Sequence, residues 1–264
     1  MSVSMKRRSV KKNVSPLRKA DQYDDPSYNY LHYWEGRQYE HMAEVAAIES
    51  LLKAKHFKHA VDIGGGYGRL CVVLTRFAQK VTLAEPSQQQ LDMAKEYLKG
   101  RPEIDCKQMQ AAHLDFADNS IDLVTMVRVI HHLPDPSSEL AEISRVLTTK
   151  GYAIIEVANL AHARNRVKYA LHGKKIPSKP VDIRSAANQS NDLPFVNHNP
   201  QTIIKQLAHA GLTVERTLSV SNLRSPALKR LIPARGMLTV ERIMQPLLAS
   251  IYFGPSIFFL VRKA

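Results

Sequence analysis

Three glycines between a buried strand and a helix are the residues best suited to bind a ligand. Gly64, Gly66 and Gly68 follow an apolar strand predicted over Ala60–Ile63. Without a Cβ they let a ligand approach the backbone and allow a positive φ in the turn. A dinucleotide fingerprint would need glycine where Arg69 stands, and a phosphate loop would end in Gly-Lys-Ser/Thr. The loop therefore predicts a nucleotide-like ligand without a pyrophosphate.

Glu85 stands at the end of the next predicted strand, Val81–Ala84. A carboxylate at this place can accept two hydrogen bonds from vicinal ribose hydroxyls, as in other nucleotide-binding α/β folds. A glycine turn is common by itself, and an acid at a strand end is often only a solvated cap. Their order and spacing together predict a nucleoside cofactor site at the carboxyl edge of a sheet.

His131 and His132 invite a metal or a general-base hypothesis. Adjacent side chains do not face one site from a regular helix, and no cluster of Asp, Glu or Cys supplies further ligands, so we expect no metal site. A structural role in the turn after the fourth strand and a base role for one histidine are both open. We assign no catalytic residue from the sequence.

Alternating strands and helices must position these residues. Strands are predicted over residues 60–63, 81–84, 104–109, 121–127, 152–157, 212–221 and 255–262. Helices are predicted at 36–53, around 70–77 and 91–98, at 138–147, from Pro200 after an Asn199 cap, and within 226–250. This rhythm indicates an α/β fold with a doubly wound, mostly parallel sheet covered on both faces. Tyr and Trp residues crowd into 23–39 and suggest a lid over the site or a satellite core.

Charge divides the chain into three parts. Residues 1–20 carry +7 and read as a disordered basic arm, residues 21–159 carry −6, and residues 160–264 carry +12, which sum to the net +13. The domain is expected to span 21–264, with an inserted segment at 160–198 and a helical insertion at 223–253. A basic half suggests an anionic partner, or simply a solvated basic surface.

Cysteine usage and hydropathy restrict the protein class. Cys71 and Cys106 form no disulfide framework and no metal motif, which favours a reducing cytoplasmic location. The sequence contains no run of 18 or more apolar residues, so no transmembrane helix is predicted.

From about Tyr33 to Lys263 the sequence resembles the class I S-adenosylmethionine-dependent methyltransferases. The resemblance is strongest to the branch that holds quinone-biosynthesis and small-molecule methyltransferases. The matching segments are Val61–Gly68, Leu83–Pro86, Ala112–Val124, His131–Asp135 and Gly254–Lys263. The resemblance implies a Rossmann-like sheet of seven strands with an antiparallel last strand. It also implies that S-adenosyl-L-methionine lies above the carboxyl ends of strands one and four.

The same resemblance assigns contacts around the first two strands. Asp62 would hold the glycine loop or reach the cofactor ammonium, and Glu85 beside Pro86 would bind the ribose. The residues that would line the methionine and ribose are Gly64, Gly65, Gly66 and Gly68.

Further contacts are implied beyond the third and fourth strands. Gln110 and Ala111 match the family's adenine-binding pair, although the family usually has an acid where Gln110 stands. The amide oxygen of Gln110 can still accept a hydrogen bond from the adenine amino group. Val127 matches a position that touches the cofactor, and Arg37 would pair with the cofactor carboxylate.

The sequence narrows the acceptor without selecting it. Residues 127–130 read Val-Arg-Val-Ile rather than the Asn/Asp-Pro-Pro-Tyr/Phe motif of amino-group methylation on DNA bases. The preferred acceptor is a small or lipid-like molecule, and the basic half suggests an anionic one. The alternatives are RNA held by the basic arm and the basic C-terminal half, and a non-catalytic binding protein on the same fold. Whether transfer goes to O, N or C, and the oligomeric state, stay open.

Overall fold

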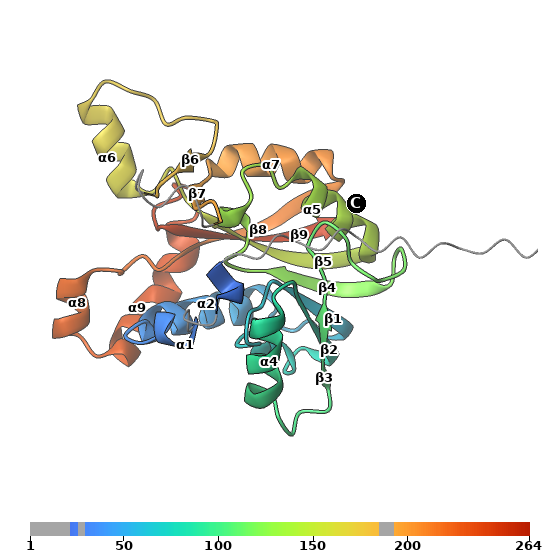
Figure 1. The fold of residues 1–264 in the computed structure, drawn as a ribbon. Coiled ribbons are helices and arrows are strands. Elements are labelled where there is room, and N and C mark those ends of the chain that lie inside the picture. The colour runs from blue at the N-terminus through green and yellow to red at the C-terminus, as the bar shows by residue number, and fades with distance from the viewer. Residues whose placement is uncertain (1–21, 26–29, 185–192) are drawn as a thin grey trace, which may run out of the picture.

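A seven-stranded sheet forms the centre of the molecule (Figure 1). The computed structural model describes residues 22–25, 30–184 and 193–264. The strands of the sheet are β1 (Phe57–Ile63), β2 (Ala78–Glu85), β3 (Ile104–Gln108), β4 (Ile121–Met126), β5 (Leu147–Ala158), β8 (Leu212–Val220) and β9 (Ser256–Lys263). Their spatial order is β3-β2-β1-β4-β5-β9-β8.

The direction of the strands confirms the fold predicted from the sequence. β3, β2, β1, β4 and β5 pair in parallel, whereas β9 runs antiparallel to β5 on one side and to β8 on the other. The last strand is thus the antiparallel one, and it lies inside the sheet.

Helices cover both faces of the sheet (Figure 1). One face packs against α2 (Gln38–Leu51), α3 (Cys71–Leu74), α4 (Gln88–Tyr97) and α9 (Ala234–Leu247). The other face packs against α5 (Ser137–Val146) and α7 (Pro200–His209). Side chains alternate between the two cores along each strand, as the period of two requires: Phe258 enters the first core and Phe259 the second.

Local sequence explains where several helices begin and end. The Asn199 side chain accepts a hydrogen bond from the N–H of Gln201 and Pro200 is the first helical residue, so α7 begins as predicted. The helix after the glycine loop is shorter than the pattern through residue 77 predicted. The carbonyl of Phe77 already accepts the N–H of Phe57, which draws the chain into the sheet.

Two segments depart from the strand–helix rhythm. The first contains α6 (Ala163–Leu171) and a small two-stranded sheet of β6 (Val181–Asp182) and β7 (Val196–Asn197). The second contains α8 (Pro226–Leu231) and α9, separated at Pro233, where a single helical stretch was predicted. In the described part of the chain, no helix combines the length and apolar character needed to cross a membrane. The predicted basic arm, 1–20, lies outside the described residues.

Short elements complete the N-terminal part and the connection after β4. These are η1 (Gln22–Asp24), α1 (Tyr30–Tyr33) and η2 (Ile130–His132). All three bring residues to the carboxyl edge of the sheet, where the site lies.

Candidate functional site

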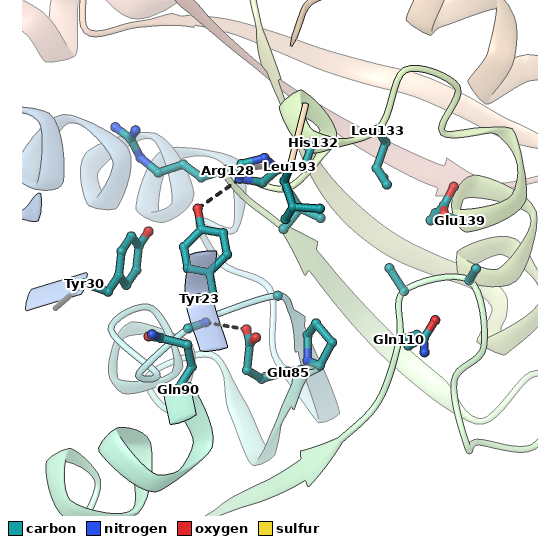
Figure 2. Close-up of a pocket in the computed structure, with 16 residues that line it drawn as sticks. Tyr23, Tyr30, Glu85, Gln90, Gln110, Arg128, His132, Leu133, Glu139 and Leu193 are labelled. Carbon is teal, nitrogen blue, oxygen red and sulfur yellow. Dashed lines mark hydrogen bonds between the residues drawn. The ribbon is translucent and has the colours of Figure 1, made fainter. Parts of the chain in front are cut away.

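A cleft with about 850 Å³ of space, part of it open to solvent, lies at the carboxyl ends of β1, β2 and β4 (Figure 2). It is lined by Tyr23, Tyr30, Gly64, Gly66, Glu85, Pro86, Gln90, Gln110, Ala111, Ala112, Arg128, Val129, His132, Leu133, Glu139 and Leu193. Six of these residues are cofactor contacts expected from the sequence: Gly64, Gly66, Glu85, Pro86, Gln110 and Ala111.

Two glycines bring the backbone of the loop after β1 to the wall of the cleft. Gly64 and Gly66 have φ angles of 62° and 59°, a region that favours glycine. A Cβ on Gly64 would lie 2.6 Å from Cγ2 of Val129, and one on Gly66 would lie 3.0 Å from Cε1 of Tyr30. Since Val129 and Tyr30 also line the cleft, side chains on the loop would crowd the space a ligand needs.

Asp62 precedes this loop and Gly65 and Gly68 belong to it, and none of the three lines the cleft. A Cβ on Gly65 would lie 2.4 Å from Oδ2 of Asp62, and one on Gly68 would lie 2.6 Å from Cδ1 of Leu98. Asp62 is buried and accepts a hydrogen bond of 2.6 Å from Oγ1 of Thr125. Burial raises the pKa of Asp62 to about 6. In this structure these three residues pack against the protein interior and do not face the cleft.

Glu85 fastens the glycine loop to the end of β2. Its Oε2 accepts the N–H of Gly66 at 2.9 Å, drawn in Figure 2, and its Oε1 accepts the N–H of Ser87 at 3.0 Å. Each carboxylate oxygen can accept more than one hydrogen bond, so Glu85 suits a ribose as well as the loop. Pro86 lines the cleft directly beside it.

Gln90 gives a test of whether these residues fit the nucleoside cofactor. It lies in the first turn of α4 and is buried, and neither Nε2 nor Oε1 has a hydrogen-bond partner among the described residues. An unsatisfied buried amide costs about 1–3 kcal/mol, so a polar ligand group is expected opposite it. The ribose and amino-acid parts of S-adenosylmethionine offer both donors and acceptors, and the cleft therefore fits this cofactor.

Arg128, and not Arg37, is the arginine on the wall of the cleft. Nε of Arg128 donates to Glu44 at 2.6 Å, and Nη1 donates to the Tyr33 hydroxyl at 2.9 Å. Burial disfavours both charges, yet their attraction raises the pKa of Arg128 and, with Arg69, lowers that of Glu44. Arg37, expected to pair with the cofactor carboxylate, does not line the cleft, because its guanidinium lies 4.1 Å over the Tyr33 ring.

The N-terminal aromatic residues cover the cleft at Tyr23 and Tyr30. Tyr23 in η1 is held by its carbonyl, which accepts the hydroxyl of Ser87 at 2.9 Å. Its own hydroxyl lies 3.0 Å from Nε2 of His132 (Figure 2), and Nδ1 of His132 lies 2.8 Å from the carbonyl of Pro194. Since a carbonyl only accepts, Nδ1 donates, and in the neutral ring Nε2 accepts from Tyr23.

Gln110 and Ala111 line the cleft after β3, at the place that the resemblance gives to adenine. Val127 does not line it, because its side chain packs into the core behind the sheet edge. Its neighbours Arg128 and Val129 take the positions on the wall.

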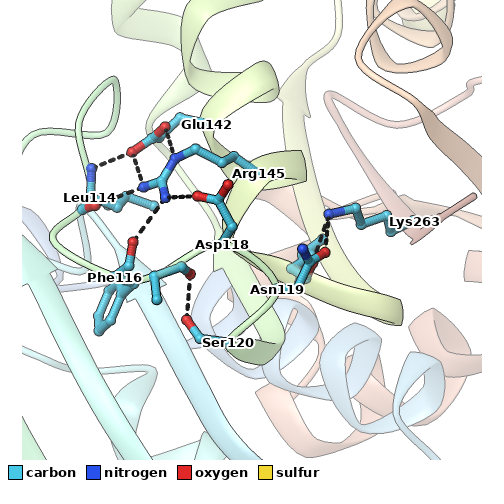
Figure 3. A network of polar contacts seen from close by, with 10 residues as sticks. Leu114, Phe116, Asp118, Asn119, Ser120, Glu142, Arg145 and Lys263 are labelled. Carbon is cyan, nitrogen blue, oxygen red and sulfur yellow. Dashed lines mark hydrogen bonds and ion pairs between the residues drawn. The ribbon is translucent and has the colours of Figure 1, made fainter.

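Arg145 of α5 fixes the loop that follows Gln110 (Figure 3). Its guanidinium donates to the carbonyls of Leu114 and Phe116, both at 2.9 Å, and pairs with Asp118 at 2.6 Å. Glu142 pairs with the same guanidinium at 2.7 Å and accepts the N–H of Leu114. The side of the cleft formed by Gln110 and Ala111 is thus anchored by residues outside the cleft.

Sequence reasoning did not single out Gln90, Arg128 or Leu193 as site residues. Arg128 carried a signal, because a basic residue directly after a buried strand lies at the edge where ligands bind. Gln90 carried none, since it is one of three successive glutamines and only the start of α4 decides which one turns inward.

A family model described as a methyltransferase domain matches residues 61–155. These residues include the glycine loop, Glu85, Gln110 and Arg128, and so most of the cleft wall.

Two relatives with methyltransferase names are similar in sequence to this chain. An uncharacterized methyltransferase of Schizosaccharomyces pombe is 26% identical over 59% of this chain and 63% of its own length. A demethylmenaquinone methyltransferase of Lactobacillus johnsonii is 34% identical over 38% of this chain and 43% of its own length. The chain thus spans less than two thirds of either relative.

The fold comparison covers more of the chain. A methyltransferase solved in complex with the Haloferax volcanii Trm112 methyltransferase activator matches 93% of this chain and 99% of its own, with a TM-score of 0.63 and 16% identity. At this identity the likeness shows the fold. Residues 61–155 of this chain therefore match a methyltransferase domain, and the seven-stranded sheet has the fold of solved methyltransferases.

Proposed function

We propose that this chain transfers a methyl group from S-adenosylmethionine to a small-molecule or lipid-like acceptor. The observation that carries the proposal is the wall formed by Gly66, Glu85 and Gln90. It offers an open backbone, a carboxylate and an unsatisfied buried amide at the carboxyl edge of the sheet (Figure 2).

Two observations support the acceptor class. The relative named for demethylmenaquinone supports a small molecule. Val129, Leu133 and Leu193 give the cleft an apolar wall, which suits a lipid-like acceptor.

When bound, S-adenosylmethionine supplies a methyl group on a sulfonium, which is already activated toward a nucleophile. The chain then has to bind, align and exclude water. Glu85 and Gln90 would hold the ribose side, and the amide oxygen of Gln110 would accept from the adenine. Tyr23 and Tyr30 would keep water from the cleft. Alignment of this kind contributes up to about 7–11 kcal/mol in favourable systems.

His132 would act where the acceptor arrives protonated. The Pro194 carbonyl fixes the proton on Nδ1, and Nε2 is then an acceptor that faces the Tyr23 hydroxyl within the cleft. An acceptor hydroxyl in the place of that phenol would give its proton to Nε2. His131 cannot take this part, because it is buried against Phe195 and burial holds its pKa well below the usual range.

Calorimetric titration with S-adenosylmethionine, followed by transfer of a radiolabelled methyl group to fractions of cell extract, tests the proposal. We expect one cofactor site per chain and label in a small-molecule or lipid fraction. A folded protein that binds no cofactor would instead support the non-catalytic alternative.

The basic charge of residues 160–264 favours RNA as the second candidate acceptor. Label recovered in RNA, with RNA binding that weakens as salt rises, would select this alternative over a small molecule.

A further inference from the structure

Most exposed large apolar side chains of the described residues lie on α6, α8, α9 and the turns beside them. The C-terminal group consists of Leu231, Ile232, Val240, Ile243, Leu247 and Ile251. Leu231 is 80% and Leu247 70% exposed. Scattered apolar residues on a surface are ordinary, but a cluster of them on successive elements indicates an interaction site.

The solvent face of α9 carries a continuous part of this cluster. Val240, Ile243 and Leu247 follow one another at intervals of three and four residues, so they share one side of the helix. Met237 and Glu241 are buried on the side that packs against the domain. The helix therefore has a second apolar stripe that covers nothing within the described structure.

α6 extends the same surface. The N–H of Ala163 donates to the carbonyl of Phe253 at 2.9 Å, and Arg166 donates to the carbonyl of Ile251. These bonds attach the start of α6 to the turn after α9, and Figure 1 shows α6, α8 and α9 at one side of the molecule. Val167 and Leu171 of α6 are exposed, Leu171 by 81%.

Basic side chains surround these apolar ones. Arg164, Lys168, Lys174 and Lys175 lie on and after α6, and all are exposed without an ion pair among the described residues. The sequence has no acid over residues 160–181. Arg230 of α8 and Arg235 of α9 are likewise exposed.

The acids near α8 and α9 leave the Lys and Arg residues named above unpaired within the described structure: Glu49 of α2 pairs with Arg242, and Glu40 of α2 pairs with Lys229. Glu241, the sole acid of residues 216–264, is fully buried and accepts hydrogen bonds from Tyr39 and Asn222. The side of the molecule formed by α6, α8 and α9 is thus both apolar and positive.

We propose that α6, α8 and α9 form a docking surface for an anionic lipid bilayer. Aliphatic side chains enter the boundary between headgroups and acyl chains, and the surrounding Lys and Arg attract anionic headgroups. The inference does not rest on the proposed methyl transfer, because it concerns a surface away from the cleft: none of these residues lines it.

The side-chain chemistry favours lipid over nucleic acid. Single-stranded nucleic acid is held by aromatic residues on which bases stack, together with a basic groove. The exposed apolar residues of α6, α8 and α9 are all aliphatic. Aliphatic groups gain by leaving water for hydrocarbon and offer no stacking surface.

Flotation of the full chain with vesicles tests the proposal. One set contains phosphatidylcholine alone, and the other contains equal parts of phosphatidylcholine and phosphatidylglycerol. We expect binding to the anionic vesicles at least about tenfold stronger, and weaker at high salt. Ile243→Ser with Leu247→Ser should lower that binding by at least about tenfold. Lys168→Gln, Lys174→Gln and Arg235→Gln should each lower it about fivefold.

Matched variants distinguish this surface from general effects. Tyr97→Ser removes an exposed ring on α4, and Lys80→Gln with Lys99→Gln removes two charges on β2 and after α4. These variants should bind vesicles like the unchanged protein. Far-UV circular dichroism checks that every variant folds.

Three results would overturn the proposal. The first is vesicle binding that survives all α6 and α9 substitutions and disappears when residues 1–20 are deleted. The second is RNA retention without vesicle binding. The third is a dimer in analytical ultracentrifugation that Ile243→Ser with Leu247→Ser dissociates while vesicles are not bound, which would assign the surface to a second copy.

Discussion

The Glu44 carboxylate in α2 lies 2.6 Å from Nε of Arg128, and this buried ion pair attaches α2 to the wall of the cleft. Glu44 is only 3% and Arg128 17% exposed in their side chains, and Arg69 pairs with the other oxygen of Glu44 at 2.7 Å. One carboxylate thus compensates two buried guanidinium groups, so α2 and the wall of the cleft are stabilised together.

Replacing Glu44 with Gln should lower the free energy of unfolding by about 3–5 kcal/mol, because two buried arginines lose their counter-charge. Urea unfolding measures this. Glu49→Gln on the same helix is the control, since Glu49 pairs with Arg76 and Arg242 at the surface and should cost under about 1 kcal/mol. Equal losses of unfolding free energy in the two variants would contradict the role assigned to Glu44.

Gly66→Ala should weaken cofactor binding at least about tenfold, since a Cβ meets Tyr30 at the cleft wall and the positive φ is strained by about 1–2 kcal/mol. Gly173→Ala meets the same strain at a φ of 63° with no atom within 4 Å of its Cβ. Calorimetry should find normal affinity in Gly173→Ala. Normal affinity in a folded Gly66→Ala protein would refute the assignment of the loop.

Glu85→Ala should weaken cofactor binding by about 1.5–3 kcal/mol, the range for a hydrogen bond to a charged group. Because Glu85 also accepts hydrogen bonds from the N–H groups of Gly66 and Ser87, the melting temperature of the variant should be lower as well. Glu96→Ala, at an exposed position on α4, is the matched control. Unchanged affinity in Glu85→Ala would mean that the ribose binds elsewhere.

Asp62→Asn should change how stability depends on pH. The folded-state pKa of Asp62 is raised to about 6 by burial, so the folded protein holds this proton more tightly than the unfolded chain does. Its contribution to stability is present at acidic pH and is lost as pH rises toward and through 6, at a cost of about 3 kcal/mol. Compared with the wild type, Asp62→Asn should therefore gain stability between pH 4 and 7.

Urea unfolding at both pH values measures this difference. Asp115→Asn, at an exposed position, controls for the loss of one negative charge. A gap between Asp62→Asn and the wild type that stays constant with pH would refute the assigned proton.

His132→Gln should slow methyl transfer to the labelled acceptor fraction by about a hundredfold or more if the acceptor is a hydroxyl, with cofactor affinity unchanged. The acidic limb of the pH–rate profile should disappear with the imidazole. Tyr23→Phe is the comparison: it removes the phenol that bonds His132 and should retain that limb. A limb that persists in His132→Gln would assign proton removal to another group.

The fold could be predicted because its signals are local. Apolar runs gave the strands, and Asn199-Pro200 gave the start of α7. The glycine loop and Glu85 could be placed in the site because both follow strands whose carboxyl ends share one edge. The shortened α3 could not be foreseen, since Phe77 leaves the helical pattern only through its pairing with Phe57.

The rest of the site depends on contacts between distant segments. Arg128 replaces Arg37 on the wall because Glu44 holds it, and these two residues are 84 positions apart. His132 faces the cleft because Pro194, in a separate segment, fixes its ring. Such pairs leave no periodicity in the sequence, and only the assembled structure reveals them.

The place of β9 between β5 and β8 has a consequence for synthesis on the ribosome. β8 is translated before β9 but has only β9 as its neighbour in the sheet. Until residues 256–263 emerge, the nascent chain therefore holds β8 unpaired and leaves the edge of β5 open. Chaperones that shield exposed strand edges thus have a defined interval in which to act, which closes when the last strand inserts.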